Sequence, residues 1–352
     1  MRFNHCFKLA LVPVLASALI GAAHAQSNEK NLTLPLNPAD FQAWRMPAHV
    51  PHPADNEPTP VRVELGKMLF FDSRLSRDGT VSCASCHNPM YGWSDGQPTA
   101  RGFHGIVLGR ASPSVYNTAY NTIQMWDGRA KTLEDQAMGP LKESKEMYAD
   151  FERLFAWLNG NAGYRQAFER AYPGEGVNEK TASKAIASFE RTIAGGDSRF
   201  DRWLAGDGAA LTLQEQRGFV VFLSKDKGNC AACHTAPNFT DNGFHNVGLT
   251  SYGAANPDLG RYNQRALPAL KGAFKTPSLR NIEATAPYFH DGSAATLMQV
   301  VEHYERGGDV KTNLSPDMKQ LALTKQDKDD LVAFMQALTA PSKLFVLPEL
   351  PR

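Results

Sequence analysis

Apolar side chains recur every three or four residues in several stretches of the chain, the spacing that lines one face of an α-helix. Residues 325–338 are such a stretch, and Thr324 before them has the side chain of an N-cap. The apolar stripe of this stretch consists of Leu331, Phe334, Met335 and Leu338. Residues 179–193 form a second amphipathic stretch that Gly195 and Gly196 would end. We expect the stripe to be core.

Alternating patterns typical of strands are few, and glycine and proline recur in residues 242–275, which is typical of a long ordered loop. The pattern therefore predicts a mainly α fold with extensive loops. At 352 residues the chain is long enough for two domains, each with its own core.

The first 25 residues have a different pattern. Arg2 and Lys8 give a positive start, residues 9–20 are apolar, and Ala23-His24-Ala25 is a small-residue cleavage signal. We expect residues 1–25 to be a signal peptide, because this apolar run suits a secretory signal better than a membrane span. No later stretch is apolar for long enough to cross a bilayer, so we expect a periplasmic protein without a membrane span after cleavage.

Charge adds little to this picture. The chain has 37 Lys and Arg residues against 36 Asp and Glu, and cleavage would remove Arg2 and Lys8 but no acid. No basic cluster stands out, so nucleic acid is not an expected partner.

The cysteines carry the clearest chemistry. Of five, Cys6 would leave with the signal peptide, and the other four form two copies of Cys-x-x-Cys-His. The copies are Cys83, Cys86 and His87, and Cys230, Cys233 and His234. Disulfides, zinc sites and redox-active dithiols also use such cysteine pairs. A histidine directly after the second cysteine, both times, favours covalent haem c, which needs two thiols for its vinyl groups and an imidazole for its iron.

The two motifs lie 147 residues apart, too far for one small haem domain to hold both. Each follows a similar segment, ELGKMLFF at 64–71 and EQRGFVVF at 215–222. We interpret these as an internal duplication of a helical cytochrome c unit. The predicted organisation is two cytochrome c-like haem domains, at 26–200 and 201–352, with residues 197–208 as their connection.

Five further segments resemble those of the bacterial di-haem cytochrome c peroxidase and MauG family over almost all of the chain after residue 25. They are WDGRAK at 126–131, GPL at 139–141, EM at 146–147, LRN at 279–281 and APYFH at 286–290. The resemblance implies that haem 1, attached at the first motif, is the peroxide site. Glu146 matches the family's distal acid/base, and Gln136 and Pro140 match residues of the same pocket. Trp126 matches an aromatic residue between the haems, whereas we expect Trp93 only to pack.

The resemblance also places a ligand on haem 2, at the second motif. Family members with a high-potential second haem use a methionine, but the matching position here is Tyr304, as in MauG and its relatives. Met298 is six residues away and His303 points about 100° away on a helix, and both stay alternatives, as does water. A phenolate favours ferric iron. We therefore expect the diferric protein to react with peroxide without prior reduction.

Two other family features are altered in this chain. Some relatives close haem 1 with a histidine from the loop before Pro113, but His104 is shifted by one position and Phe103 stands at the match. We therefore expect His104 to be a surface-loop residue. The family also binds calcium through backbone oxygens that match Thr285 and Pro287 and through an asparagine that is Ala111 here. A calcium ion is thus expected only if water replaces that side chain.

The leading functional hypothesis is a periplasmic peroxidase that reduces hydrogen peroxide with electrons from a small cytochrome c or cupredoxin. The first alternative is a MauG-like enzyme that oxidises residues of a partner protein. Such enzymes use a tryptophan two residues before the second motif, and this position is Gly228 here. The second alternative is a di-haem electron carrier without catalysis. A homodimer is a further expectation from the family.

Overall fold

The computed structural model of the protein describes residues 33–342 and 344–352, so the predicted signal peptide lies outside the described residues. Helices dominate this part of the chain, and the mainly α prediction is confirmed. The one strand pair described there is short and antiparallel, with Phe244 opposite Lys275. In chain order the elements are α1 (Pro60–Phe71), α2 (Cys83–Cys86), α3 (Leu133–Lys142), α4 (Phe151–Gly160), α5 (Ala162–Ala171), α6 (Glu179–Glu190), α7 (Arg199–Leu204), α8 (Leu213–Leu223), β1 (Phe244–His245), β2 (Phe274–Lys275), α9 (Leu297–Glu305) and α10 (Lys325–Ala337).

Both helices that the apolar pattern predicts are present. α10 begins after Thr324, whose hydroxyl accepts a hydrogen bond from the Asp327 amide at 3.1 Å, and all four stripe residues are buried. α6 ends at Glu190 rather than at residue 193. The chain tightens there, because the amides of Thr192 and Ile193 bond carbonyls three residues back instead of four.

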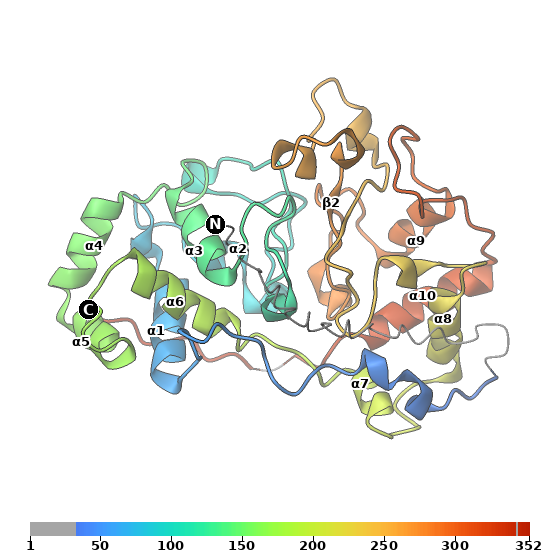
Figure 1. Cartoon of the computed structure of the whole chain (residues 1–352), viewed down its shortest axis with the longest axis horizontal. Coiled ribbons are helices and arrows are strands. Elements are labelled where there is room, and N and C mark those ends of the chain that lie inside the picture. Colours follow the sequence, from blue (N-terminus) through green and yellow to red (C-terminus); the bar gives the residue numbers. More distant parts are fainter. Residues whose placement is uncertain (1–32, 343) are drawn as a thin grey trace, which may run out of the picture. The chain divides into compact units, whose positions relative to one another are not determined.

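Within the described residues, a glycine allows a close helix crossing at two places. α1 crosses α6 at Gly66, where an added Cβ would lie 1.9 Å from the Ala185 carbonyl oxygen. α8 crosses α10 at Gly218, where an added Cβ would lie 2.0 Å from the Asp330 carbonyl oxygen. Figure 1 shows both helix pairs. The repeated crossing supports the predicted internal duplication.

Aromatic rings fill the space beside each crossing. The ring centroids of Phe70 in α1 and Phe189 in α6 are 5.2 Å apart. Trp93 packs in the same cluster and is buried, as expected. In the other cluster, the ring centroids of Phe219 in α8 and Phe334 in α10 are 4.9 Å apart. Burial of such rings stabilises both helix pairs.

Two segments pack far from their sequence neighbours. Phe41, in the 3-10 helix Pro38–Trp44, packs on Phe219 of α8, with the two ring centroids 5.0 Å apart. Phe345, near the C-terminus, stacks on Phe71 of α1 at 5.1 Å. Phe41 belongs to the first predicted domain but packs on a helix of the second, and Phe345 belongs to the second but packs on a helix of the first. The boundary between residues 200 and 201 stays a prediction.

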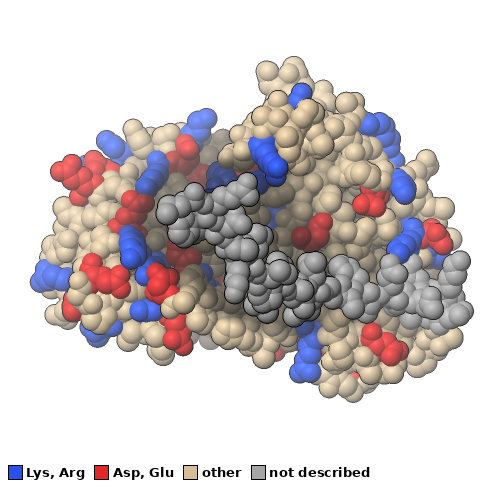
Figure 2. Space-filling view, viewed as in Figure 1, with Lys and Arg blue, Asp and Glu red and all other residues tan. Residues whose placement is uncertain are grey.

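The surface that Figure 2 shows carries basic and acidic side chains interspersed, in keeping with the near balance of charges in the sequence. Within residues 33–342 and 344–352, no helix combines the length and the hydropathy that a bilayer span requires.

Candidate functional site

The first Cys-x-x-Cys-His motif is a short helix with an imidazole at its end. α2 contains Cys83 and Cys86, both with free thiols, and His87 follows as the C-cap. The His87 Nδ1 lies 3.3 Å from the Trp93 carbonyl oxygen. Burial lowers the pKa of His87 to about 4, so the ring is neutral at pH 7. With Nδ1 engaged by a carbonyl, Nε2 is the nitrogen left to bind a metal.

The second motif repeats this arrangement, with a shorter distance between the histidine Nδ1 and the backbone carbonyl oxygen. Cys230 begins a 3-10 turn and, like Cys233, has a free thiol. The His234 Nδ1 lies 2.9 Å from the Phe239 carbonyl oxygen, and burial lowers the pKa of His234 to about 4. Each motif therefore presents two thiols and one neutral imidazole, the donor set that covalent haem c requires.

Two of the alternative uses of these cysteines, disulfides and a zinc site of paired cysteines, are not seen in the described residues. All four thiols are free, so neither pair forms a disulfide. The one described group of Cys, His, Asp and Glu atoms within 4.8 Å of one another joins Cys233 to Asp241 and His245, and thus includes a single thiol. His245 Nε2 lies 2.7 Å from the Asp241 carboxylate, so these two side chains already satisfy each other. A zinc site built from paired cysteines has no counterpart here.

The pocket at the first motif brings the predicted residues of haem 1 together. Cys83, Cys86 and His87 line it with Gln136 and Pro140 of α3 and with Glu146. Apolar side chains make up much of the rest of its wall, among them Phe70, Val81, Leu108 and Ile186. A largely apolar cavity beside two thiols and an imidazole fits a haem c group.

Backbone contacts hold Glu146 in this pocket. Its carbonyl oxygen accepts a hydrogen bond from the Phe103 amide at 2.7 Å. Gly102 makes this approach possible, because an added Cβ there would lie 2.0 Å from the Lys145 carbonyl oxygen. Burial raises the pKa of the Glu146 carboxyl, and Arg129, 4.0 Å away, partly opposes this. The role of Gly102 could not be predicted from the sequence, since a loop glycine carries no local sign of such a contact.

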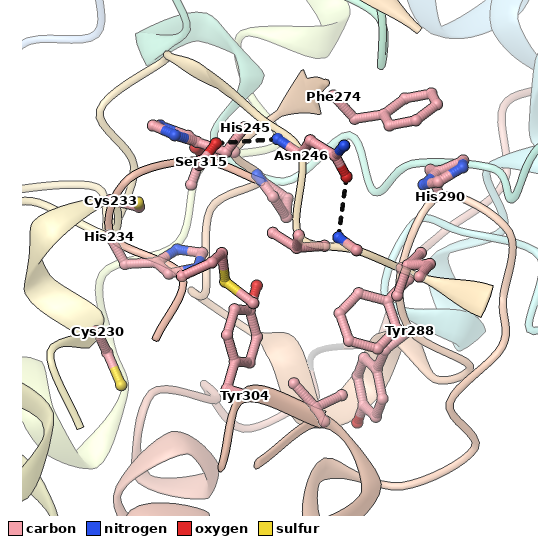
Figure 3. Close-up of a pocket in the computed structure, with 18 of the residues that line it drawn as sticks. Cys230, Cys233, His234, His245, Asn246, Phe274, Tyr288, His290, Tyr304 and Ser315 are labelled. Carbon is pink, nitrogen blue, oxygen red and sulfur yellow. Dashed lines mark hydrogen bonds between the residues drawn. The ribbon is translucent and has the colours of Figure 1, made fainter. Parts of the chain in front are cut away.

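The pocket at the second motif has a phenol instead of a carboxylate. Figure 3 shows Cys230, Cys233, His234 and Tyr304, which all line this pocket. Tyr304 extends from α9, and no described group forms a hydrogen bond with its hydroxyl. Burial raises the pKa of Tyr304 well above its usual value of 10. In the apolar pocket this phenol would ionise only against a cation, and ferric iron is one.

The alternative ligands Met298 and His303 are not among the residues that line this pocket. The His303 Nε2 lies 2.8 Å from the Val247 carbonyl oxygen, and its Nδ1 lies 3.3 Å from Asp309. Both ring nitrogens are therefore engaged elsewhere. The role of Tyr304 as a ligand remains a prediction that this geometry supports.

Trp126 also lines the second pocket and is held at both its side chain and its backbone. Its indole N–H donates to the Ala111 carbonyl at 2.9 Å, and its carbonyl accepts from the Lys275 amide at 2.8 Å. The centroid of the indole lies 6.4 Å from that of the His290 ring. The His290 ring stacks on Phe274, with their centroids 3.5 Å apart. Both rings line the second pocket, and Figure 3 labels them.

The remaining predicted residues, His104, Thr285 and Pro287, do not line either pocket. The His104 side chain is 69% exposed and stacks on Phe103, and neither residue lines the first pocket, in agreement with a surface loop. The Thr285 hydroxyl donates to the Ile282 carbonyl at 3.0 Å. Calcium binding at Thr285 and Pro287 remains a prediction that would depend on backbone oxygens.

Known proteins match the chain over almost its whole length. A family model described as di-haem cytochrome c peroxidase matches residues 60–209. The methylamine utilization protein MauG of Methylorubrum extorquens is 42% identical, over 94% of this chain and 92% of that relative. Cytochrome c551 peroxidase of Nitrosomonas europaea is 36% identical, over 98% of this chain and 96% of that relative. A solved structure of a MauG-like protein associated with microbial copper homeostasis matches with a TM-score of 0.78 and 33% identity, over 84% of this chain and 95% of that one. The chain therefore belongs to the di-haem cytochrome c peroxidase family, with two haem c groups as its cofactors.

Proposed function

We propose that this protein is a periplasmic di-haem peroxidase that reduces hydrogen peroxide to water. The observation that carries this proposal is the difference between the two pockets. The pocket of His87 contains the carboxyl of Glu146, whereas the pocket of His234 contains the phenol of Tyr304. The first pocket would supply a group for proton transfer to a substrate, and the second would supply two ligands, His234 and Tyr304, to an iron.

The side chains of the first pocket would act on the two oxygens of peroxide. His87 would hold the iron, and bound haem would supply an open coordination position and a place to exchange electrons. Glu146 would take a proton from the near oxygen and give it to the leaving oxygen, beside Gln136 and Pro140. The balanced reaction is H₂O₂ plus two electrons and two protons, giving two water molecules. Because the pKa of Glu146 is raised, its carboxyl can hold the transferred proton more readily than an exposed glutamate would.

His234 and Tyr304 would hold the second iron. A phenolate oxygen stabilises ferric iron, so this centre would not store an electron for the reaction in advance. Trp126, which lines this pocket, would carry electrons between the two centres. We therefore propose that the diferric protein reacts with peroxide directly.

The predicted signal peptide of residues 1–25 would direct export of the chain to the periplasm. There a small cytochrome c or cupredoxin would donate electrons near the second pocket. A calcium ion at the Thr285 and Pro287 carbonyls and a homodimer are family features that we carry over as predictions. Cell fractionation and equilibrium sedimentation with and without a chelator would check these points.

Electron paramagnetic resonance of the diferric holoprotein, with and without peroxide, tests the main proposal. We expect one high-spin and one low-spin haem at rest, and loss of both signals within one turnover of added peroxide. Reduced cytochrome c added afterwards should restore the resting spectrum. Two low-spin haems that are inert toward peroxide would instead indicate a di-haem electron carrier.

Oxidation of a partner protein is the second candidate function. The 42% identity to MauG and the tyrosine in the second pocket favour it. Against it, the position two residues before the second motif is Gly228, where an added Cβ would lie 2.6 Å from the Val221 carbonyl oxygen. A tryptophan relay therefore has no room at this place without a backbone shift. Mass spectrometry of candidate periplasmic proteins after incubation with enzyme and peroxide would reveal partner oxidation.

A further inference from the structure

Glu190, the last residue of α6, is a buried acid that the proposed peroxide chemistry does not use. It is 4% exposed and lines the first pocket together with Cys83 and His87. Its Oε2 atom has no hydrogen-bond partner among the described residues. Burial of an unpaired carboxyl is costly, so a residue kept here for packing alone would be expected to be apolar.

The second helix pair shows what packing alone would select at this position. Phe189 of α6 and Phe334 of α10 occupy equivalent places, since each meets the crossing glycine of the partner helix. The next residue is Glu190 in one pair and Met335 in the other. Met335 is also buried and lines the second pocket. The same position beside a haem thus holds a thioether in one unit and a carboxyl in the other.

The cations near Glu190 are engaged with other groups. Arg191 follows it directly, but its guanidinium binds Glu134 of α3 at 2.8 Å. On α1, Arg62 lies over the Tyr172 ring and Lys67 over the Phe345 ring.

Other titratable groups around Glu190 do not neutralise it either. Lys142 of α3 pairs with Glu179. The Cys83 sulfur of α2, a thioether once haem is attached, and the Glu146 carboxyl face the same pocket, and neither supplies a positive charge. Burial raises the pKa of Glu190 to about 8, and the charge of Glu134 adds to this, although the neighbouring Arg191 guanidinium partly opposes it.

We propose that Glu190 is the redox-linked proton site of haem 1, which binds one proton when haem 1 is reduced and releases it when haem 1 is oxidised. The electron comes from the reductant, an electrode or a donor protein, and the proton comes from water. An added electron in the apolar pocket makes the carboxylate form less favourable and so increases the affinity of Glu190 for a proton. This inference depends on haem attachment at Cys83 and Cys86, but not on peroxidase activity.

Spectroelectrochemical titration of both haems in the holoprotein, from about pH 6 to about pH 10, tests the inference around the expected pKa. In the wild type, the midpoint potential of haem 1 should fall as pH rises. The upper limit is a tenfold change in the reduction equilibrium per pH unit, about 59 mV for one electron. In Glu190→Gln the side chain stays neutral at every pH, so most of this slope should disappear.

Haem 2 serves as the internal control, because Met335 replaces the carboxyl beside it and its potential should be unchanged in Glu190→Gln. Glu190→Met, which copies the second unit, should also lose the slope while both haems stay attached. Glu146→Gln should retain the slope even though peroxide reactivity falls. An unchanged slope in Glu190→Gln and Glu190→Met, or its loss in Glu146→Gln instead, would overturn the inference and leave the proposed peroxidase function untouched.

Discussion

At the scale of single residues, the carboxyl of Glu146 should determine the reaction with peroxide. Glu146→Gln removes the proton acceptor, and we expect the rate of reaction with peroxide to fall by about 10²- to 10⁴-fold. In the wild type the rate should also fall as pH drops through the raised pKa of Glu146, since a protonated carboxyl cannot act as the base. Stopped-flow spectroscopy measures both effects. Glu152→Gln, an exposed residue of α4, is the matched control and should react like the wild type.

Tyr304 permits a second test at this scale. Tyr304→Met replaces an oxygen ligand by a thioether, which favours ferrous iron, so the midpoint potential of haem 2 should rise. The variant should then need partial reduction before it reacts with peroxide. Met298→Leu, on the same helix but outside the pocket lining, is the control and should leave the potential unchanged. A haem 2 potential that is the same in Tyr304→Met and the wild type would contradict ligation by Tyr304.

At the scale of elements, the crossing of α1 and α6 depends on the missing side chain of Gly66. Gly66→Ala places a methyl group 1.9 Å from the Ala185 carbonyl oxygen, so the helices must separate. We expect a loss of about 1–3 kcal/mol in the free energy of unfolding. Gly160→Ala, at the exposed end of α4 with open space around it, is the control. Thermal unfolding followed by circular dichroism compares the two, and equal midpoints would contradict the close crossing.

The loop that supports Glu146 can be tested in the same way. Gly102→Ala would push the backbone of residues 145–146 away, since the added Cβ lies 2.0 Å from the Lys145 carbonyl oxygen. A displacement of about 1 Å at a catalytic group can cost on the order of 10²-fold in rate. We expect this loss in the peroxide reaction, with haem content unchanged. Gly109→Ala, in the same loop but with open space around it, should show wild-type kinetics.

At the scale of the whole molecule, Arg280 joins three segments that are distant in sequence. Its guanidinium binds Asp201 of α7 at 2.7 Å, the Trp44 carbonyl at 2.8 Å and the Pro237 carbonyl at 3.0 Å. Arg280→Met leaves Asp201 buried without its cation, which should cost about 3–5 kcal/mol. Arg202→Met, an exposed position of α7, is the control. If chemical denaturation shows the same stability for both variants, the junction contributes little.

Local chemistry explains what could be predicted from the sequence. Haem attachment depends on thiols and an imidazole within five consecutive residues, so both motifs were evident from spacing alone. The start of α10 was evident because Thr324 caps its own helix, and the buried stripe followed from helical periodicity. The likeness to the family added Glu146 and Tyr304 to the expected site. Periodicity had also placed His303 and Met298 on other faces of α9.

Contacts between distant residues decided the rest. Residues 38–44 pack against α8, which is far from them in the chain, and Gly102 supports the distant Glu146. The position of Glu190 beside haem 1 depends on how α1 and α6 cross. Such contacts leave no periodic or local trace in the sequence, since each is set by the packing of whole elements. The sequence alone therefore determined which cofactors are attached and where. Only the tertiary structure showed the further side chains that surround them, such as Glu190 and Met335, because their positions depend on the crossing of α1 with α6 and of α8 with α10.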